Sequence, residues 1–416
     1  MIQRTQYLQQ LIDSIGNGLI KTITGIRRCG KSVLLRDIFG LWLKEQGVKD
    51  DHIIYLSFDD MENEELRQPK EFLKMIYGRI SDDKTHYLLL DEVQLMDRFV
   101  EVLLSLMQKR VFDIFVTGSN SRFLSKDIVT EFRGRSQEIQ MQPLTFSEYM
   151  GAYEGNRENA WVDYYEFGGL PQILSFKTRQ QKISYLSNLV DTVYVKDIVE
   201  RNKLKNENGL TELLRILSSS IGAPCNPSRI ARTFESVEKR HVPSDTVSRH
   251  IRYFTESFII SEALRYDVKG RRYIGTETKY YFSDMGLRNS ILGFRQIEEN
   301  HLMENILYNE LKYRGYNVDV GMVEITERDA EGTQVRKKLE VDFIANQGSK
   351  RYYIQSAYRM ENDEKVKQEK RSLTKIHDSF RKIIIVKDHI APYHDDDGVL
   401  RIGLLDFLLN PNSLDM

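Results

Sequence analysis

Short, continuous apolar runs alternate with stretches of helical periodicity along the first 145 residues. Such runs suit parallel strands buried on both faces, because crossover helices cover each side of the sheet. Helical patterns around residues 70–80 and 98–110 fit those crossovers. We therefore predict an α/β fold built on a parallel sheet. Its expected strands are residues 19–24, 52–58, 86–93, 112–119 and 135–141.

Residues 208–294 follow a different pattern, in which three helices precede two strands. The third helix begins after Pro243 with Ser244 as its cap. Its apolar residues share one face, as packing against partner helices requires, and these are Val247, Ile251, Phe254 and Phe258. Three helices and a hairpin of this kind resemble a winged helix.

A winged helix commonly binds DNA through its third helix and its hairpin turn. Arginine and lysine at these places can contact phosphates. The candidate nucleic-acid contacts are Arg249, Arg252, Lys269, Arg271 and Arg272. The alternative is a protein-interaction or ring-packing module, because nearby acids dilute the positive charge.

Residues 295–416 predict a further α/β unit. A helix ends at Gly315, a strand hairpin spans 337–358, a charged helix covers 361–377, and a strand covers 382–386. This order resembles the restriction-endonuclease-like PD-(D/E)xK nuclease fold. By that resemblance Glu304 is the acid on the helix, Asp342 is the metal-binding aspartate, and Gln355 stands where a glutamate belongs.

Two replacements argue against cleavage by this unit. Mg²⁺ prefers anionic oxygen ligands, for which the amide of Gln355 is a weak substitute. Ala357 occupies the place of the lysine that would stabilise transition-state charge, at a cost of roughly 3 kcal/mol. We expect a nuclease-like remnant without nuclease activity.

Charge and cysteine content narrow the class of protein. The 60 Lys and Arg residues nearly balance the 61 Asp and Glu residues, so any nucleic-acid surface must be local. The two cysteines imply no disulfide framework. The sequence has neither a signal-peptide core nor an apolar run of the roughly 20 residues that a membrane span needs. We expect a cytoplasmic protein without membrane contact.

Residues 25–32 carry the strongest chemical motif. They read GIRRCGKS, which matches the GxxxxGK[ST] phosphate-binding loop between a strand and a helix. Glycines permit the tight turn, the lysine reaches the β- and γ-phosphates, and the serine hydroxyl can ligate Mg²⁺. We predict ATP and Mg²⁺ as cofactors. The expected nucleotide contacts from the motif are Gly25, Arg28, Cys29, Gly30, Lys31, Ser32 and Val33.

Two acids end the expected strand 86–93, at the edge where open α/β sheets carry their active sites. Asp91 would hold Mg²⁺ together with Ser32. Glu92 would orient and deprotonate the attacking water.

The segments LLLDE, VTGSNS (116–121) and FRGRSQEIQMQPLTFSEY (132–149) resemble the AAA-type ATPases of bacteria and archaea, in the branch fused to a C-terminal domain of unknown function. The resemblance implies that Asn120 senses the γ-phosphate. It also implies that Arg133 or Arg135 enters a neighbouring subunit's site, and hence a homo-oligomer such as a hexameric-type ring. A solvated basic loop is the alternative for the two arginines.

The same resemblance implies a helical lid. The capping box formed by Thr145 and Glu148 begins it, and the turn of residues 168–171 would bring Pro171 near the nucleotide. The expected domains are an ATPase core (1–145), the lid (146–207), a winged helix (208–294) and the nuclease-like unit (295–416).

These motifs together predict an oligomeric, Mg²⁺-dependent ATPase that remodels or moves DNA, with branched DNA as one candidate substrate. An ATP-driven signalling switch with protein-binding modules is one alternative. A nucleolytic defence effector is the other, and it requires cleavage by the last unit.

Overall fold

The computed structural model describes residues 2–118, 132, 134–204, 208–237, 241–295, 297–328, 332–360 and 363–416. Asn120 and Arg133, two of the residues singled out above, lie outside this part of the chain. The chain forms two compact units. Unit 1 comprises Met1–Leu144, Leu170–Gln172 and Glu256–Phe258, and unit 2 comprises the remaining residues.

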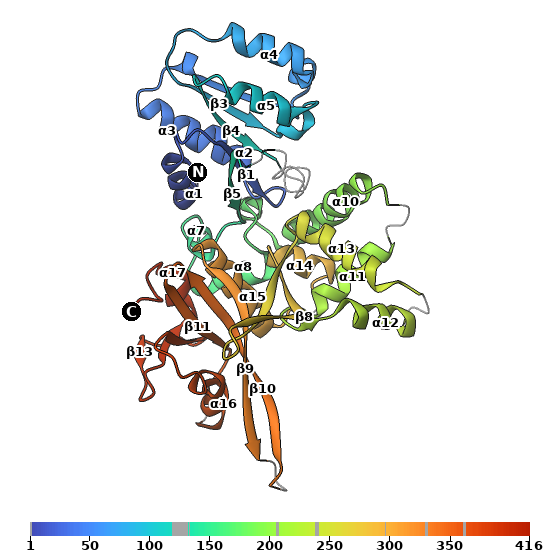
Figure 1. Ribbon diagram of the computed structural model, residues 1–416, viewed down its shortest axis with the longest axis vertical. Coiled ribbons are helices and arrows are strands. Elements are labelled where there is room, and N and C mark those ends of the chain that lie inside the picture. Colours follow the sequence, from blue (N-terminus) through green and yellow to red (C-terminus); the bar gives the residue numbers. More distant parts are fainter. Residues whose placement is uncertain are drawn as a thin grey trace. The chain divides into compact units, whose positions relative to one another are not determined.

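Unit 1 is built on a five-stranded sheet in the order β2-β3-β4-β1-β5 (Figure 1). Every neighbouring pair is parallel, which confirms the predicted α/β fold with a parallel sheet. The carboxyl ends of all five strands therefore lie at one edge. The strands are β1 (Ile20–Gly25), β2 (Ile53–Ser57), β3 (His86–Asp91), β4 (Phe112–Thr117) and β5 (Ser136–Met141).

Alternate side chains of the central strands pack on opposite helical layers. Leu88 and Leu90 of β3 belong to a core that includes Phe72 of α4. Leu89, between them, faces the segment after the phosphate loop, where it approaches Gly40. The helices and turns of this unit are α1 (Thr5–Asp13), α2 (Lys31–Val33), η1 (Leu34–Phe39), α3 (Gly40–Glu45), η2 (Asp50–His52), η3 (Met61–Arg67), α4 (Pro69–Gly78), η4 (Val93–Leu95) and α5 (Phe99–Met107).

A group of helices opens unit 2. The Thr145 side chain accepts a hydrogen bond from Glu148 N, and Thr145 N donates to the Glu148 carboxylate, so the predicted capping box is present. Phe146 then packs edge-on against Trp161 and Tyr164. This segment contains α7 (Phe146–Met150), α8 (Arg157–Phe167), η5 (Pro171–Ser175), α9 (Arg179–Leu189), η6 (Val190–Val195) and α10 (Lys196–Arg201), and the first two residues of η5 belong to unit 1.

The rest of unit 2 surrounds a nine-stranded mixed sheet in the order β13-β14-β12-β11-β10-β9-β7-β8-β6. The expected helices and strands of the middle segment are all present. The helices are α11 (Asn208–Ser219), α12 (Pro227–Val237), α13 (Ser244–Glu256), α14 (Met285–Ile291), α15 (Glu299–Tyr313), α16 (Asp363–Thr374) and α17 (Leu404–Leu409). The strands are β6 (Pro224–Cys225), β7 (Ile260–Asp267), β8 (Arg272–Phe282), β9 (Asn317–Arg328), β10 (Gln334–Gln347), β11 (Lys350–Ala357), β12 (Arg381–Val386), β13 (Tyr393–His394) and β14 (Leu400–Gly403).

One sheet thus contains strands from two of the predicted domains. β7 pairs in parallel with β9 through Arg265, Tyr266 and Asp267, across the expected boundary at residue 294. β9 and β10 continue as a long two-stranded ribbon beyond their neighbours (Figure 1). The finer division into a winged helix and a nuclease-like domain remains a prediction.

Candidate functional site

The phosphate loop at the end of β1 has the backbone that only glycine accepts readily. Gly25 has a φ of 140°, and a Cβ there would lie 2.1 Å from the Met141 carbonyl oxygen. Gly30 has a φ of 102° at the start of α2. Both angles lie in the region that side chains rarely adopt. The two glycines therefore set the curvature of the loop around its own amide groups.

Lys31 is buried, and its ammonium group points back into this loop. Nζ donates hydrogen bonds to the carbonyl oxygens of Gly25 (3.0 Å) and Ile26 (3.2 Å). These partners hold the ammonium on the inner side of the turn. A phosphate group bound by the loop amides would meet the same ammonium.

Asp91 lies next to the loop at the end of β3, where three neighbouring strands end. It accepts hydrogen bonds from the hydroxyls of Thr117 and Ser32. Burial raises the pKa of Asp91 above its ordinary value, and these hydrogen bonds oppose that shift. Ser57 donates to the other carboxylate oxygen at 3.4 Å. Ser32 and Asp91, predicted as Mg²⁺ ligands, are thus in direct contact.

Glu92 follows Asp91 in a left-handed conformation with a φ of 52°. Its backbone N–H donates to Thr117 Oγ1 at 3.0 Å, and its carboxylate accepts from Gln94 Nε2. These contacts fix the carboxylate at the carboxyl edge of the sheet, where it remains half-buried. Sequence reasoning missed Thr117 and Gln94, because only the register between β3 and β4 brings the threonine to the acids.

The remaining predicted nucleotide contacts differ in their surroundings. Pro171 lies beside Gly30, where its Cγ is 3.8 Å from the position of a Cβ. Cys29 is fully buried, with Sγ 3.7 Å from the Met141 carbonyl oxygen, so it packs behind the loop. Arg28 and Val33 are exposed.

The residues fit ATP and Mg²⁺ on chemical grounds. The turn has positive φ angles at Gly25 and Gly30, its lysine supplies positive charge, and the paired hydroxyl and carboxylate are hard oxygen donors. Arg135 does not join this set, because it lies exposed just before β5, at the amino edge of the sheet. The roles predicted for Asn120 and Arg133 concern residues outside the described ranges.

A second polar cluster lies in unit 2 and is built around the buried Lys279 of β8. Its ammonium forms ion pairs with Glu304 of α15 (3.0 Å) and Glu340 of β10 (2.7 Å). Burial alone would lower the pKa of Lys279, but the carboxylates of Glu304, Asp342 and Glu340 together raise it. Tyr281 also donates to Glu304, at 2.7 Å.

Asp342 lies in this cluster at an irregularity in the pairing of β10 with β9. Its carboxylate accepts the backbone N–H of Ser356 at 2.8 Å. Burial, with Glu304 nearby, raises the pKa of Asp342 well above its ordinary value. Gln355 instead approaches Ser372 Oγ at 3.5 Å. The structure brings Glu304 and Asp342 together, and Lys279 is the partner that sequence reasoning missed.

The predicted nucleic-acid contacts fall into two groups. Arg249 and Arg252 are exposed on α13, opposite its buried apolar face. Lys269 donates to the Glu324 carbonyl oxygen at 2.8 Å, which ties the hairpin turn to β9. Arg271 is exposed in that turn with a φ of 51°.

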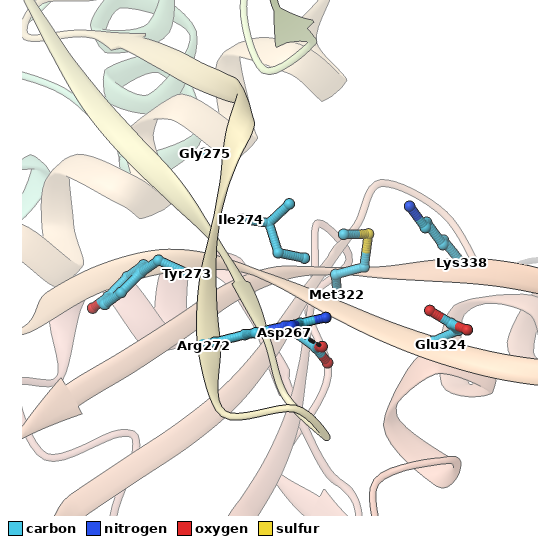
Figure 2. Close-up of a pocket in the computed structure, with 8 residues that line it drawn as sticks. All are labelled: Asp267, Arg272, Tyr273, Ile274, Gly275, Met322, Glu324 and Lys338. Carbon is cyan, nitrogen blue, oxygen red and sulfur yellow. Dashed lines mark ion pairs between the residues drawn. The ribbon is translucent and has the colours of Figure 1, made fainter.

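Arg272, the remaining predicted contact, lines a pocket of about 340 Å³ beside the ribbon. Figure 2 shows its side chain directed at Asp267, with which it forms an ion pair of 3.8 Å. The lining carries charges of both signs, so it favours no single class of ligand. The lining residues are Asp267, Arg272, Tyr273, Ile274, Gly275, Met322, Glu324 and Lys338.

Two known family models match parts of this chain, and one of them includes the phosphate loop. Residues 17–150 match a family model described as an AAA domain. Residues 158–298 match a model described as a domain of unknown function (DUF8612). The first unit therefore contains an AAA-type ATPase domain, as predicted.

An uncharacterized protein of Haemophilus influenzae is 31% identical over 418 residues, covering 98% of this chain and 99% of that protein. The chain belongs to the family of that protein. An uncharacterized protein of Methanocaldococcus jannaschii is 26% identical over 391 residues, covering 91% of this chain and 82% of that one.

Similarity to solved structures is weak. The structure titled as the Aeropyrum pernix ORC1 protein in complex with DNA matches with a TM-score of 0.31 and 12% identity, over 70% of this chain and 92% of that one. A score this low establishes neither a shared fold nor a shared function. Among the described residues, no helix combines the length and apolar character of a membrane span.

Proposed function

We propose that this protein is an oligomeric, Mg²⁺-dependent ATPase that couples ATP hydrolysis to the binding and remodelling of DNA. The observation that supports the ATPase chemistry best is the convergence of three groups at one sheet edge. The Lys31 ammonium lies inside the loop, Ser32 and Asp91 are in contact, and Glu92 follows directly.

Each residue then has a distinct task in hydrolysis. The loop amides and Lys31 bind and orient the phosphates, and Ser32 with Asp91 holds the metal ion. Mg²⁺, when bound, neutralises charge on the phosphate oxygens. Glu92 positions a water molecule in line with the γ-phosphate and accepts its proton.

Two substitutions separate binding from hydrolysis. We expect Lys31→Ala to abolish ATP binding and turnover, because the buried ammonium that would meet the phosphates is lost. Glu92→Gln should retain ATP binding and lose at least about a hundredfold in turnover, since an amide is no base. Equilibrium binding of labelled ATP and phosphate release measure the two effects. Turnover by Glu92→Gln equal to that of the native chain would remove Glu92 from the chemistry.

We also propose that neighbouring copies complete each site with Arg133 or Arg135. Support comes from the position of Arg135, which is at the sheet edge away from its own phosphate loop. Mixing Lys31→Ala chains with Arg135→Ala chains tests for such a shared site. A Lys31→Ala chain still supplies the arginine, and an Arg135→Ala chain still supplies an intact phosphate loop. Turnover restored only in the mixture supports an arginine acting between copies, and the same test applies to Arg133.

DNA is the proposed substrate because exposed arginines gather on the predicted winged helix. Arg249 and Arg252 lie on α13, and Arg229 and Arg232, which sequence reasoning missed, are exposed on α12. Such arginines suit phosphate contacts, which also predicts binding that weakens steeply as salt rises.

A panel of single-stranded, duplex and four-way junction DNAs tests this part of the proposal. We expect DNA to stimulate turnover, and a quadruple alanine variant at Arg249, Arg252, Arg271 and Arg272 to weaken DNA binding about tenfold or more. Lys70→Ala with Lys74→Ala controls for the loss of surface positive charge elsewhere, because both lysines are exposed on α4 of unit 1. If no DNA changes turnover, the ATPase assignment survives and the DNA assignment fails.

The competing function is a signalling switch whose C-terminal modules bind proteins. It is favoured by the internal contacts of the hairpin turn, where Lys269 and Arg272 already have protein partners. Unchanged DNA binding by the quadruple variant would support this switch.

We further propose that the nuclease-like part does not cleave DNA. The buried Lys279 ammonium pairs with Glu304 and Glu340 and is close to Asp342, so a cation of the chain itself balances these acids. Plasmid incubated with Mn²⁺ or Mg²⁺ should remain intact. Cleavage that disappears in Asp342→Ala would instead support the defence effector.

A further inference from the structure

Two buried histidines and an acid meet at the amino edge of the unit 1 sheet. His52 ends η2 just before β2, His86 begins β3, and Asp82 lies in the loop before β3. One ring nitrogen of each histidine and one oxygen of Asp82 lie within 4.8 Å of one another. β2 and β3 are parallel neighbours, so this edge is opposite the edge that carries the phosphate loop.

The second nitrogen of each histidine is held by a neighbour of its own. His86 Nδ1 lies 2.9 Å from the Lys84 carbonyl oxygen, which can only accept a hydrogen bond, so this nitrogen carries the proton. His52 Nδ1 lies 2.8 Å from an Asp51 carboxylate oxygen. Metal-binding histidines are commonly oriented in this way by a carbonyl or carboxylate.

The two Nε2 atoms consequently face the shared space beside Asp82. His52 Nε2 lies 2.9 Å from Asp82 Oδ1. His86 Nε2 presents a lone pair, which the Ser81 N–H approaches at 3.3 Å. A metal ion here would replace the proton between His52 and Asp82. It would also accept the lone pair of His86 Nε2, in place of the long hydrogen bond from the Ser81 N–H.

We propose that His52, Asp82 and His86 form a binding site for a divalent transition metal, with Zn²⁺ as the best match. Two imidazoles and a carboxylate suit zinc, whereas Mg²⁺ prefers oxygen ligands alone. Tetrahedral zinc holds its ligand atoms roughly 3.3 Å apart, so the 2.9 Å separation of His52 Nε2 and Asp82 Oδ1 must widen slightly and any longer separation, up to 4.8 Å, must close. Asp82 can supply that movement because its side chain is 39% exposed, in a loop.

The site links two loops that are distant in sequence. Residues 50–52 and 81–86 would share one ion, which fixes the amino ends of β2 and β3 relative to each other. Three protein ligands leave one position for water, and the exposed Asp82 directs that position to solvent. A bound ion stabilises the folded state in proportion to the logarithm of its concentration.

The test uses the full chain without a polyhistidine tag, with excess Mg²⁺ to occupy oxygen-rich sites. Zn²⁺ titration should give one bound equivalent and a higher unfolding midpoint. Co²⁺ in the unsubstituted chain should give the visible bands of a tetrahedral site with nitrogen ligands. Neither measurement depends on ATP turnover.

Variants of the two loops decide whether these residues bind the metal. Asp82→Ala and His52→Gln should each weaken Zn²⁺ binding about tenfold or more. Asp83→Ala removes the adjacent exposed acid and should bind Zn²⁺ as the native chain does. No zinc uptake by the native chain, or equal uptake by Asp82→Ala and Asp83→Ala, would overturn the proposal.

Discussion

At the scale of single residues, unit 1 contains a buried ion pair inside its sheet. Lys21 of β1 is fully buried and forms an ion pair with Asp113 of β4. Its ammonium also lies 4.7 Å from the centre of the Phe115 ring, and Asp113 accepts the Gly16 N–H at 2.9 Å. Removing one partner of such a pair leaves the other charge buried without compensation.

We expect Asp113→Ala to lower the free energy of unfolding by about 3–5 kcal/mol. The double variant Lys21→Met with Asp113→Leu should recover most of that loss, because no charge stays buried. Urea unfolding of the native chain and both variants measures the effect. A loss in the double variant as large as in Asp113→Ala would show that packing, rather than the unpaired ammonium, is responsible.

Asp342 makes stability depend on pH. Its pKa is raised in the folded chain by burial and by Glu304. The folded state therefore holds a proton that the unfolded state has released, and stability falls as pH rises above the ordinary value of 3.8 toward the folded pKa. Asp342→Asn removes this dependence. We therefore expect the stability of the variant, relative to that of the native chain, to increase as pH rises from 5 to 8.

Unfolding midpoints at several pH values check this expectation. Glu364→Gln on α16 is the control, because that acid is exposed and should leave the pH profile unchanged. A constant difference between Asp342→Asn and the native chain would mean that Asp342 is already ionised.

At the scale of elements, motifs confined to a few neighbouring residues predicted the structure better than contacts between distant strands could be predicted. The glycines and lysine of the phosphate loop act within eight residues, so their spacing sufficed to predict the turn. The pairing of Thr117 with Asp91 depends on strand register, and the pairing of Lys279 with Glu304 and Glu340 depends on three separate elements. No sequence pattern marked those contacts, because tertiary packing alone creates them.

The capping box of α7 gives a test at this scale. Thr145→Ala removes the hydrogen bond to Glu148 N, and we expect it to cost about 1 kcal/mol of stability. Thr145→Ser keeps the hydroxyl and should cost less. Chemical unfolding of unit 2 compares them, and equal losses would assign the effect to the lost methyl group.

At the scale of the molecule, the nine-stranded sheet joins two predicted domains. A chain cut after residue 294 would leave β7 without β9, and it would separate Lys279 from Glu304 and Glu340. We expect residues 1–294 and 295–416 to aggregate when produced separately and to associate when produced together. Size-exclusion chromatography distinguishes these outcomes. Two soluble, monomeric fragments would support the predicted boundary instead.

The two predicted C-terminal domains share one continuous sheet, so they are not expected to move independently. α12 and α13, the helices that carry the exposed arginines, precede β7 and β8 in the chain. Hydrogen bonds join β7 to β8 and to β9, the neighbour of the strand that carries Glu340 and Asp342. The family model of unknown function ends at residue 298, between strands of one continuous sheet. Because these hydrogen bonds join both parts of the sheet, we expect a displacement of the β7–β8 hairpin to displace β9 and β10 as well.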